Sequence, residues 1–479
     1  MARGGRTWKP TLEARMVPAP FSSGSSYPVR VTPAVDYLVD GEASFAAIAD
    51  AIEAAQSYVY ITCCYVDLNF RLRPPNQEQL LDLCQRTAAR GVRVALLFWQ
   101  PVDAGGNPDN GVGGTVPLSR QPELEKSAPA VLCRWDQAKG RWVYPSKAGC
   151  HHQKTFIIDG QLAFVGGINM TQNYWDTPAH KATDERRVSY GLQDAQQRKA
   201  AAADPKQLPL HDLFSKFTGP AVSDVEANFV ERWNGATHKA NAPDLTIGPT
   251  GTDPASGVSI QVLRTIAPQT YPHTANGDGS IKQGMLNLLN GATESVYFEN
   301  QYFFDGDIAA AMRSAALRGV RIVGLLAREP DAGSAFGWAE KQLRISSYRS
   351  FQATMDDPHV KQQLQLYSPF TEGPSPNKDI YVHAKALVVD ERYVLLGSAN
   401  ISFTSLAFHS EMSILVDDAV GAKRLLRQLF CEHLCIDDSL IPKTFAKTAE
   451  LWKQHGAENK KAQVSGQPLA SRVVPLLID

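Results

Sequence analysis

Hydrophobic residues follow two alternating periods along the chain. Between Phe45 and Ala55 they recur every three or four residues, which is typical of a helix with one buried face. The next segment, residues 57–61, is rich in aromatic and β-branched residues, which predicts a buried strand. The same order of helix and strand returns between Ser280 and Phe303. The pattern therefore predicts an α/β protein in which a helix-strand unit is repeated.

The repetition continues through a second helix and strand. Residues 88–99 match residues 315–327, and each segment has a glycine, Gly91 or Gly319, where its helix is expected to end. Duplication of one α/β unit is the simplest explanation. We therefore expect two tandem halves of helix-strand alternation, each with its own sheet.

A segment without hydrophobic period separates the two halves. Residues 241–257 are rich in Pro, Gly, Ala and Thr, which is typical of a linker. Residues 1–240 are therefore expected to form the N-terminal half, and residues 258–479 the C-terminal half. Two further segments of the first half, residues 101–114 and 196–207, are expected to be long loops.

Composition and charge narrow the function classes. The chain has 48 basic and 49 acidic residues, so its overall charge does not favour nucleic acid or an anionic bilayer. Its seven cysteines are scattered, which favours reduced thiols over a disulfide framework. The sequence opens without a secretory leader and contains no apolar run of about 18 residues. We therefore expect a soluble protein without a Sec-type signal, either cytoplasmic or exported as an effector by a specialised secretion system.

One polar pattern occurs twice, at matching positions of the two halves. In each copy a histidine and a lysine lie on the same face of an expected strand, an aspartate ends that strand, and a glycine turn precedes an asparagine. The spacing from the histidine to the turn is the same in both copies, which chance does not readily explain. The two copies consist of His152, Lys154, Asp159 and Asn169, and of His383, Lys385, Asp390 and Asn400.

These residue types suit an anionic, tetrahedral group. Two lysines supply positive charge, and two asparagines supply amide donors. Two histidines can divide the work of bonding and proton transfer. A phosphodiester fits these properties best, so we expect a reaction at a phosphodiester bond.

The duplicated pattern resembles the signature of the phospholipase D superfamily. This resemblance implies that the halves pack about a pseudo-twofold axis, share one active site and need no metal or other cofactor for the chemistry. It implies that one histidine attacks phosphorus to form a phosphohistidine, while the other protonates the leaving alcohol and then activates water. By the same resemblance, His152 is the expected nucleophile and His383 the expected acid and base. The expected phosphate contacts are Lys154, Lys385, Asn169 and Asn400.

Acidic residues are expected to support these histidines. In the family an acidic residue that follows each motif orients a ring, and Asp184 and Glu411 stand at the matching positions. The motif aspartates, Asp159 and Asp390, fall at strand ends. We therefore expect them to act indirectly or to support the fold, and not to carry protons.

Several segments outside the motifs resemble lipid-type members of the superfamily. Residues 211–234 contain a Gly-Pro-Ala-Val turn and end in Arg-Trp-Asn, and residues 260–265, 297–303 and 432–434 are similar to further family segments. These features favour a phospholipase D catalytic core without accessory membrane-targeting domains. One departure is the run after Asn400, which lacks the Arg-Ser pair of many members.

The resemblance implies a phospholipase D that hydrolyses glycerophospholipids to phosphatidic acid and a free headgroup, with transfer to alcohols as a side activity. Three alternatives stay open: a cardiolipin synthase-like phosphatidyltransferase, a nucleic-acid phosphodiesterase, and a degenerate member that serves as a binding scaffold. The expected partner is a phospholipid at a membrane surface, contacted peripherally and without a transmembrane helix. No nucleic-acid partner is expected. A monomer is expected because both halves of the site lie in one chain.

Overall fold

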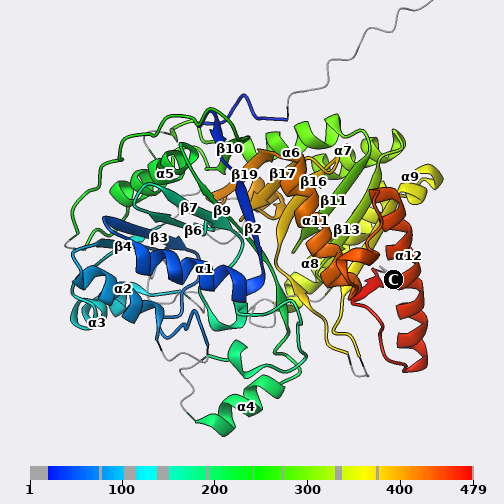
Figure 1. The fold of residues 1–479 in the computed structure, drawn as a ribbon, viewed down its shortest axis with the longest axis horizontal. Coiled ribbons are helices and arrows are strands. Elements are labelled where there is room, and N and C mark those ends of the chain that lie inside the picture. The colour runs from blue at the N-terminus through cyan, green and yellow to red at the C-terminus, as the bar shows by residue number, and fades with distance from the viewer. Residues whose placement is uncertain are drawn as a thin grey trace, which may run out of the picture.

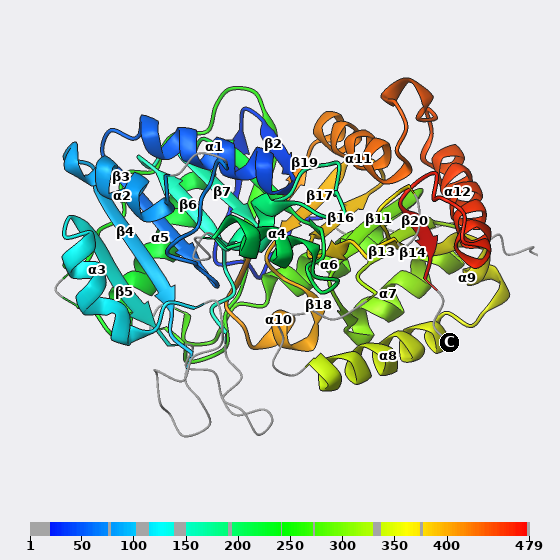
Figure 2. The ribbon, with the colours of Figure 1, turned by 90° about the horizontal axis from the view of Figure 1, so that it is seen from below.

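The two halves predicted from the sequence lie side by side. The computed structural model describes residues 20–74, 78–101, 115–137, 150–189, 194–240, 242–271, 274–328, 337–373 and 377–476. In Figures 1 and 2 the first half, coloured blue to green, lies beside the second half, coloured green to red. Each half has its own sheet with helices packed against it, so the predicted α/β class with two similar sandwich halves is confirmed.

The first sheet has seven strands in the order β2, β9, β7, β6, β3, β4, β5. Pairing is parallel from β3 to β4 and from β4 to β5, and antiparallel between the other neighbours. The strands are β2 (Val35–Val39), β3 (Tyr58–Cys63), β4 (Arg93–Trp99), β5 (Val131–Asp136), β6 (Thr155–Ile158), β7 (Leu162–Gly166) and β9 (Leu213–Thr218).

The second sheet repeats this plan. Its inner order of β10, β19, β17, β16, β11, β13, β14 has the same sequence of antiparallel and parallel pairings, and β1 and β20 are added at its two edges. The matching order supports a duplicated unit. The strands are β1 (Val29–Thr32), β10 (Val258–Thr265), β11 (Ser295–Asn300), β13 (Arg321–Leu326), β14 (Leu364–Pro369), β16 (Lys385–Val389), β17 (Tyr393–Gly397), β19 (Glu411–Asp417) and β20 (Val473–Pro475).

Each helix that covers a sheet has one apolar face. In α1 (Asp40–Ala54), Phe45, Ile48 and Ile52 recur at helical spacing and are all buried. α2 (Leu80–Ala89) begins at a capping box formed by Gln79 and Asp82. The other helices are α3 (Gln121–Ser127), α4 (Ala195–Ala203), α5 (Ala221–Gly235), α6 (Ser280–Gly291), α7 (Gly306–Leu317), α8 (Gly337–Thr354), α9 (Pro358–Gln363), α10 (Phe403–Ala407), α11 (Ala419–Leu434) and α12 (Phe445–Ser465).

The two halves exchange short segments. β1 lies before residue 240 in the sequence, yet it pairs with β10 at the edge of the second sheet. β8 (Leu210–His211) of the first half pairs in parallel with β15 (Tyr381–Val382) of the second. One hydrophobic core cluster also contains residues of both sheets. The boundary expected at residue 240 therefore describes the sequence repeat but not the division in space.

The predicted connections are only partly correct. The described part of the linker, residues 242–257, contains no helix or strand, as expected. The loop expected at residues 196–207 is wrong, because α4 occupies most of it and is capped by the Asp194 side chain. The loop expected at residues 101–114 lies almost wholly outside the described residues. Two short strands, β12 (Phe303–Phe304) and β18 (Ile401–Ser402), form a separate pair.

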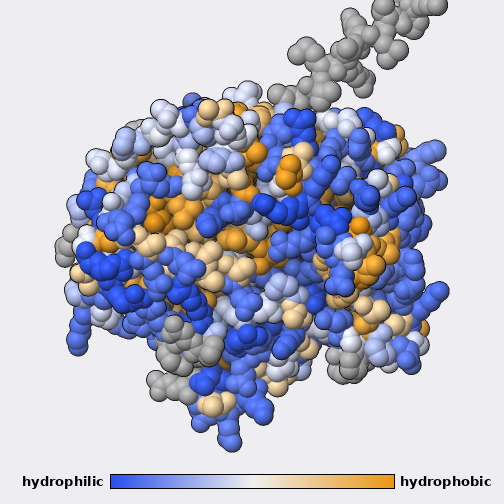
Figure 3. All heavy atoms as spheres, in the orientation of Figure 1, coloured by the Kyte–Doolittle hydropathy of each residue, from blue (hydrophilic) through white to orange (hydrophobic). Residues whose placement is uncertain are grey.

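The surface of the protein carries both hydrophilic and hydrophobic residues. Figure 3 shows hydrophilic residues over much of one face, with hydrophobic residues gathered in patches between them. Every helix in the part of the chain that the structure describes is too short or too polar to span a bilayer.

Candidate active site

The two motif histidines meet where the sheets face each other. His152 lies three residues before β6, and His383 lies two residues before β16. Their ring centroids are 6.4 Å apart, and both residues are largely buried. The structure therefore brings both copies of the pattern into one site, as the sequence predicts for a shared centre.

Backbone hydrogen bonds exchanged between the halves place these histidines. The His152 N–H donates to the carbonyl of Ser410 at 2.9 Å, and the His383 N–H donates to the carbonyl of His211 at 2.8 Å. Each acceptor directly precedes an acidic residue in the sequence, Glu411 or Asp212. The exchange therefore brings an acid of one half beside the histidine of the other.

Each ring contacts one of these carboxylates. His152 Nδ1 lies 3.0 Å from Glu411 Oε2, so the expected support from Glu411 has a direct contact. His383 Nδ1 lies 2.6 Å from Asp212 Oδ2. A carboxylate at Nδ1 fixes the ring tautomer and leaves Nε2 to face the reaction.

The expectation that Asp184 orients a motif histidine is wrong. Its carboxylate accepts from the backbone N–H and the guanidinium of Arg186, the latter at 2.6 Å. Asp212 lies beside His383 instead.

The position of Asp212 relative to the following helix could have identified it from the sequence. Glu411 begins β19, the strand before α11, and Asp212 directly precedes β9, the strand before α5. Counting back from the following helix finds Asp212, whereas counting forward from His152 stops at Asp184, before the inserted helix α4.

The glycine turns differ between the halves at one position. A Cβ on Gly167 would lie only 2.3 Å from Asp212 Oδ1, so this close approach requires glycine. The equivalent residue of the second half, Ser398, donates its hydroxyl to Glu411 Oε2 at 2.5 Å. Its carbonyl lies 3.1 Å from His152 Nδ1. Asp212 therefore packs against the backbone of a glycine, whereas Glu411 accepts an additional hydrogen bond from a serine.

Each motif lysine contacts the backbone of the histidine in its own motif. Lys154 Nζ donates to the His152 carbonyl at 2.7 Å, and Lys385 Nζ donates to the His383 carbonyl. Both side chains are buried, and burial lowers the pKa of Lys385 to about 7, with Asp212 opposing the shift. The pair concentrates positive charge beside both rings, as binding of an anion requires.

The two asparagines follow their glycine turns and are buried. Asn169 Oδ1 accepts from the Tyr65 N–H at 3.2 Å, while Asn169 Nδ2 has no hydrogen-bond partner among the described residues. Asn400 likewise carries a buried amide oxygen that no described group satisfies. An unpartnered buried amide group is costly unless a ligand engages it. The Asn169 amide N–H is suited to donate to a bound phosphate, whereas the unpartnered atom of Asn400 is an oxygen, which only accepts.

The two histidine-acid pairs differ in the pKa values of their acids. Burial lowers the pKa of His152 to about 4, with Glu411 opposing and Lys154 reinforcing the shift. Burial alone would raise the pKa of Glu411, but the interactions with His152 and His409 outweigh it and hold that pKa below its ordinary value. The pair is therefore a neutral imidazole beside an ionised carboxylate at neutral pH.

In the second pair the pKa of the acid is raised and not lowered. Burial raises the pKa of Asp212 to about 7, and burial together with Lys385 and Lys154 lowers the pKa of His383 well below its ordinary value. Asp212 is thus poised to hold a proton near neutral pH, and the short contact to His383 can pass it to the ring.

Two further side chains at the site had no place in the predicted set. The Tyr174 hydroxyl lies 3.1 Å from His383 Nε2. The His409 ring lies 6.2 Å from the His152 ring, and its Nδ1 is 3.6 Å from Glu411 Oε1. Neither residue belongs to the repeated pattern, so the repeat gave no signal for them.

The motif aspartates support the fold. Asp159 accepts three backbone hydrogen bonds from residues 56–58, and Asp390 accepts three from residues 293–295. Each aspartate stands about 20 Å of extended strand beyond its histidine. Both hold the turn before a central strand, β3 or β11, which agrees with the structural role expected for them.

The cysteines are all free thiols. Cys63 Sγ lies 3.7 Å from Asn169 Oδ1, and the Sγ atoms of Cys64 and Cys150 are 3.5 Å apart. The free thiols agree with the expectation of reduced thiols, which stays a prediction.

Family models match both halves of the chain. The model described as Phospholipase D matches residues 51–309. The model described as Cardiolipin synthase, PLD-like domain matches residues 285–434. Together they cover both copies of the duplicated pattern.

Curated relatives include two kinds of enzyme. Phospholipase D A of Dictyostelium discoideum is 24% identical over 449 residues, with 82% of this chain and 34% of that protein covered. Phospholipase D gamma 1 of Arabidopsis thaliana is 26% identical, with 75% and 56% covered. Cardiolipin synthase A of Pseudomonas entomophila (strain L48) is 23% identical, with 92% and 75% covered. The chain thus spans between a third and somewhat over half of these two phospholipases D.

A solved structure shares the fold. Phosphatidylserine synthase of Haemophilus influenzae Rd KW20 aligns over 92% of this chain and 97% of its own, with a TM-score of 0.56 and 14% sequence identity. At this identity the likeness supports the fold alone.

Proposed function

Because the chain belongs to the phospholipase D superfamily, we propose that it transfers the phosphatidyl group of a glycerophospholipid to water through a covalent phosphohistidine. The observation that carries this proposal is the pair of buried histidines, 6.4 Å between centroids, each with a carboxylate on Nδ1. Such a pair can attack phosphorus from one side and protonate the leaving oxygen on the other.

His152 is the better nucleophile of the two. Its Nδ1 is occupied by Glu411, and its Nε2 forms no hydrogen bond to another described residue. Its side chain is 11% exposed against 4% for His383, whose Nε2 faces Tyr174. A neutral ring with a free Nε2 lone pair can form the bond from nitrogen to phosphorus as the bond to the headgroup oxygen breaks.

The proton for the leaving group comes from the second pair. His383 Nε2–H donates to the departing headgroup oxygen, and the Asp212 carboxyl passes its proton to Nδ1 across the 2.6 Å contact. In the second step water attacks phosphorus and gives a proton back to His383, which restores Asp212 and frees His152. A small alcohol in place of water would give the phosphatidyl alcohol.

Charge and amide donors would stabilise the pentavalent phosphorus. Lys154 and Lys385 stand beside the rings, and Asn169 offers an unpartnered amide N–H. These groups are fixed before substrate arrives, so they lower the barrier without reorganisation.

The first experiment uses phosphatidylcholine and phosphatidylethanolamine vesicles with a primary alcohol, followed by lipid mass spectrometry. Wild type should form phosphatidic acid and the phosphatidyl alcohol. His152→Ala and His383→Ala should each lose at least about 10³-fold in rate. His359→Ala, an exposed histidine of α9, is the matched control and should be unchanged. Absence of any lipid product from wild type would refute the proposal.

The roles of the two histidines are separated by a substrate whose leaving group needs no proton. With phosphatidyl-p-nitrophenol, His383→Ala should release one equivalent of p-nitrophenolate and retain a phosphatidyl adduct on a His152 peptide. His152→Ala should give neither burst nor adduct. The reverse result would exchange the two assignments while leaving the phosphohistidine route intact.

A second candidate is a cardiolipin synthase-like phosphatidyltransferase. It is favoured by the family model that matches residues 285–434 and by the larger mutual coverage with cardiolipin synthase A. The same vesicles with phosphatidylglycerol as the acceptor test it. Cardiolipin formed faster than phosphatidic acid would select this function over hydrolysis.

A further inference from the structure

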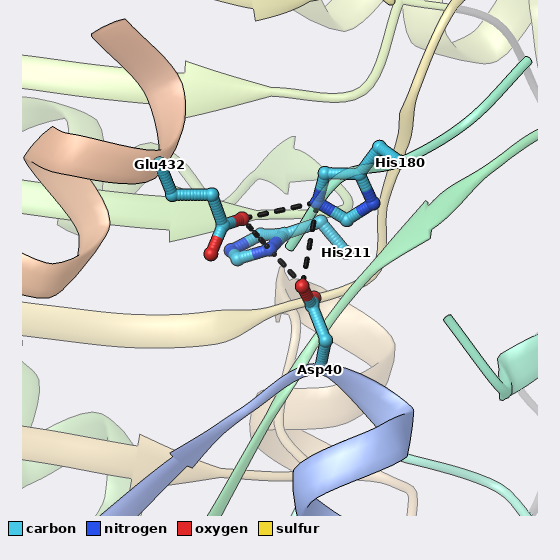
Figure 4. A group of neighbouring side chains, drawn as sticks. All are labelled: Asp40, His180, His211 and Glu432. Carbon is cyan, nitrogen blue, oxygen red and sulfur yellow. Dashed lines mark hydrogen bonds and ion pairs between the residues drawn. The ribbon is translucent and has the colours of Figure 1, made fainter. Parts of the chain in front are cut away.

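Four side chains outside the reacting groups converge in the core between the halves. They are Asp40 at the start of α1, His180, His211 of β8 and Glu432 of α11 (Figure 4). Three come from the first half and one from the second. All four are buried, with 0 to 8% of their surface exposed.

The potential ligand atoms lie close together. One nitrogen or oxygen of each residue lies within 4.8 Å of all the others. His211 Nδ1 is 2.9 Å from Asp40 Oδ1 and 3.0 Å from Glu432 Oε1, while His180 Nε2 is 3.0 Å from Glu432 Oε1 and 3.4 Å from Asp40 Oδ2. A tetrahedral ion bonded at about 2.0–2.1 Å has edges of about 3.3 Å, close to these separations.

Hydrogen bonds alone leave this cluster incomplete. Asp40 Oδ2 and Glu432 Oε2 are buried carboxylate oxygens without a hydrogen-bond partner among the described residues. Each inward nitrogen, one on His180 and one on His211, can supply only one proton. Two N–H groups cannot satisfy four carboxylate oxygens, and buried unpaired oxygens are costly.

The outer contacts are those of metal-bound imidazoles. His180 Nδ1 lies 3.2 Å from Asp176 Oδ2, and His211 Nε2 lies 2.9 Å from Glu299 Oε2. A carboxylate behind each ring fixes the tautomer with its free lone pair pointing inward. Asp176 is itself paired with Arg187 at 2.9 Å, so it needs no charge from the ion.

The charges balance for a divalent ion. Two inner carboxylates, Asp40 and Glu432, and two neutral imidazoles make an N₂O₂ set of charge −2, which a divalent ion neutralises. Without an ion, the same balance requires two added protons on the cluster. The ion would therefore replace two protons. Two nitrogen ligands and a four-coordinate arrangement favour Zn²⁺ over Ca²⁺ or Mg²⁺, which prefer oxygen and higher coordination.

We propose that Asp40, His180, His211 and Glu432 bind one structural Zn²⁺ ion that fastens the two halves together beside the active site. The site is closed, with four protein ligands, and the ion touches none of the reacting groups. This proposal goes beyond the proposed function, because no step of the phosphohistidine chemistry takes place at the ion.

The ion would act on catalysis only through position. His211 directly precedes Asp212, and its carbonyl accepts the N–H of His383 at 2.8 Å. The Asp40 N–H donates to the carbonyl of Asp212 at 2.8 Å. Two of the four ligands are thus bonded through their backbones to the Asp212–His383 pair.

The test measures metal content, which does not depend on activity. Full-length protein is purified from zinc-supplemented culture, dialysed against EDTA and analysed by inductively coupled plasma mass spectrometry. We expect about one zinc per chain, retained because the site is buried. Protein produced with cobalt instead should show the intense visible bands of a tetrahedral Co²⁺ complex. Both readouts stand even if the chain has no lipid activity.

Matched variants locate the ion. His211→Gln and Glu432→Gln should lose the metal and melt at least about 5 °C lower. His433→Gln is the control because it removes a neighbouring ring, 2.9 Å from Glu299, that is not a ligand. It should keep one equivalent.

Two results would overturn the proposal. Wild type that carries less than about a tenth of an equivalent, and gains no thermal stability when refolded with Zn²⁺, would leave the cluster as a proton-linked ion network. Metal retained by both ligand variants would place the ion elsewhere. The wild-type measurement decides the question even if the variants do not fold.

Discussion

The two histidine-acid pairs are equivalent by topology but different in chemistry. His152 with Glu411 and His383 with Asp212 both form by the same exchange between halves. At Glu411 the acid is ionised, and the Ser398 hydroxyl donates to it. At Asp212 the acid packs against Gly167, and burial raises its pKa to about 7.

The difference teaches how a duplicated site can divide one reaction. An extra hydrogen bond to a carboxylate favours its ionised form, whereas burial without one favours the neutral form. A serine in one turn and a glycine in the other would thus help to separate the proposed nucleophile from the proposed proton donor. The following changes test this asymmetry, beginning with the largest expected effect.

Asp212→Asn removes the stored proton. The rate on phosphatidylcholine should fall by about 10²–10⁴-fold, because a poor leaving group needs proton transfer. The rate on phosphatidyl-p-nitrophenol should fall by no more than about tenfold. Steady-state kinetics on both substrates measure the split.

Glu411→Gln is the matched change in the other pair. It should slow both substrates alike, because Glu411 supports the nucleophile and not the leaving group. Equal losses on both substrates for Asp212→Asn as well would contradict the proposed division of roles.

The pH profile of kcat/KM should have two limbs. Activity rises with pH through about 4, because His152 must lose its proton to attack. It falls above about pH 7, because Asp212 loses the stored proton and Lys385 loses its charge. Rates on vesicles should drop about tenfold per pH unit below the lower limb, and between about tenfold and a hundredfold per unit above the upper limb, where two groups titrate.

Two variants assign the upper limb. Lys385→Arg, whose charge does not titrate there, should keep this limb if Asp212 carries it. Asp212→Asn should remove or shift it. An upper limb that is lost in Lys385→Arg and retained in Asp212→Asn would assign the limb to the lysine.

Ser398→Ala removes only the hydroxyl that separates the two turns. Losing a hydrogen bond to a charged group costs about 1.5–3 kcal/mol, so we expect a rate loss of about 10- to 150-fold. The measurement is the single-turnover rate of adduct formation on phosphatidyl-p-nitrophenol. A rate within twofold of wild type would show that the serine does not support the nucleophile.

The acids outside the two pairs should matter least for activity. Asp184→Ala should change the rate by less than about twofold, because its carboxylate pairs with Arg186. Asp159→Ala should leave the rate per folded molecule similarly unchanged but lower the free energy of unfolding by about 1–3 kcal/mol, since three backbone N–H groups lose their acceptor. Urea unfolding and vesicle assays separate the two effects. A large rate loss in Asp184→Ala would restore it as a catalytic support.

The repeat made the fold and the centre of the site predictable. Helical and strand periods repeat in order, so two similar α/β units followed from local pattern, and the doubled motif placed both histidines in one centre. The exchange of strands and acidic residues between the halves could not be predicted from the sequence. Asp212 lies far from His383 in the sequence, and β1 joins a sheet built from the second half, so neither contact follows from local pattern.

The crossing of β1 also sets the timing of assembly during synthesis. Its partner, β10, emerges about 230 residues later, which at ordinary translation speeds is a delay of about 10–50 s. Throughout that interval the edge strand has no partner, and His152 lacks the acid and the carbonyl that orient it. A growing chain therefore lacks the complete pair of histidine-acid contacts until its second half is made.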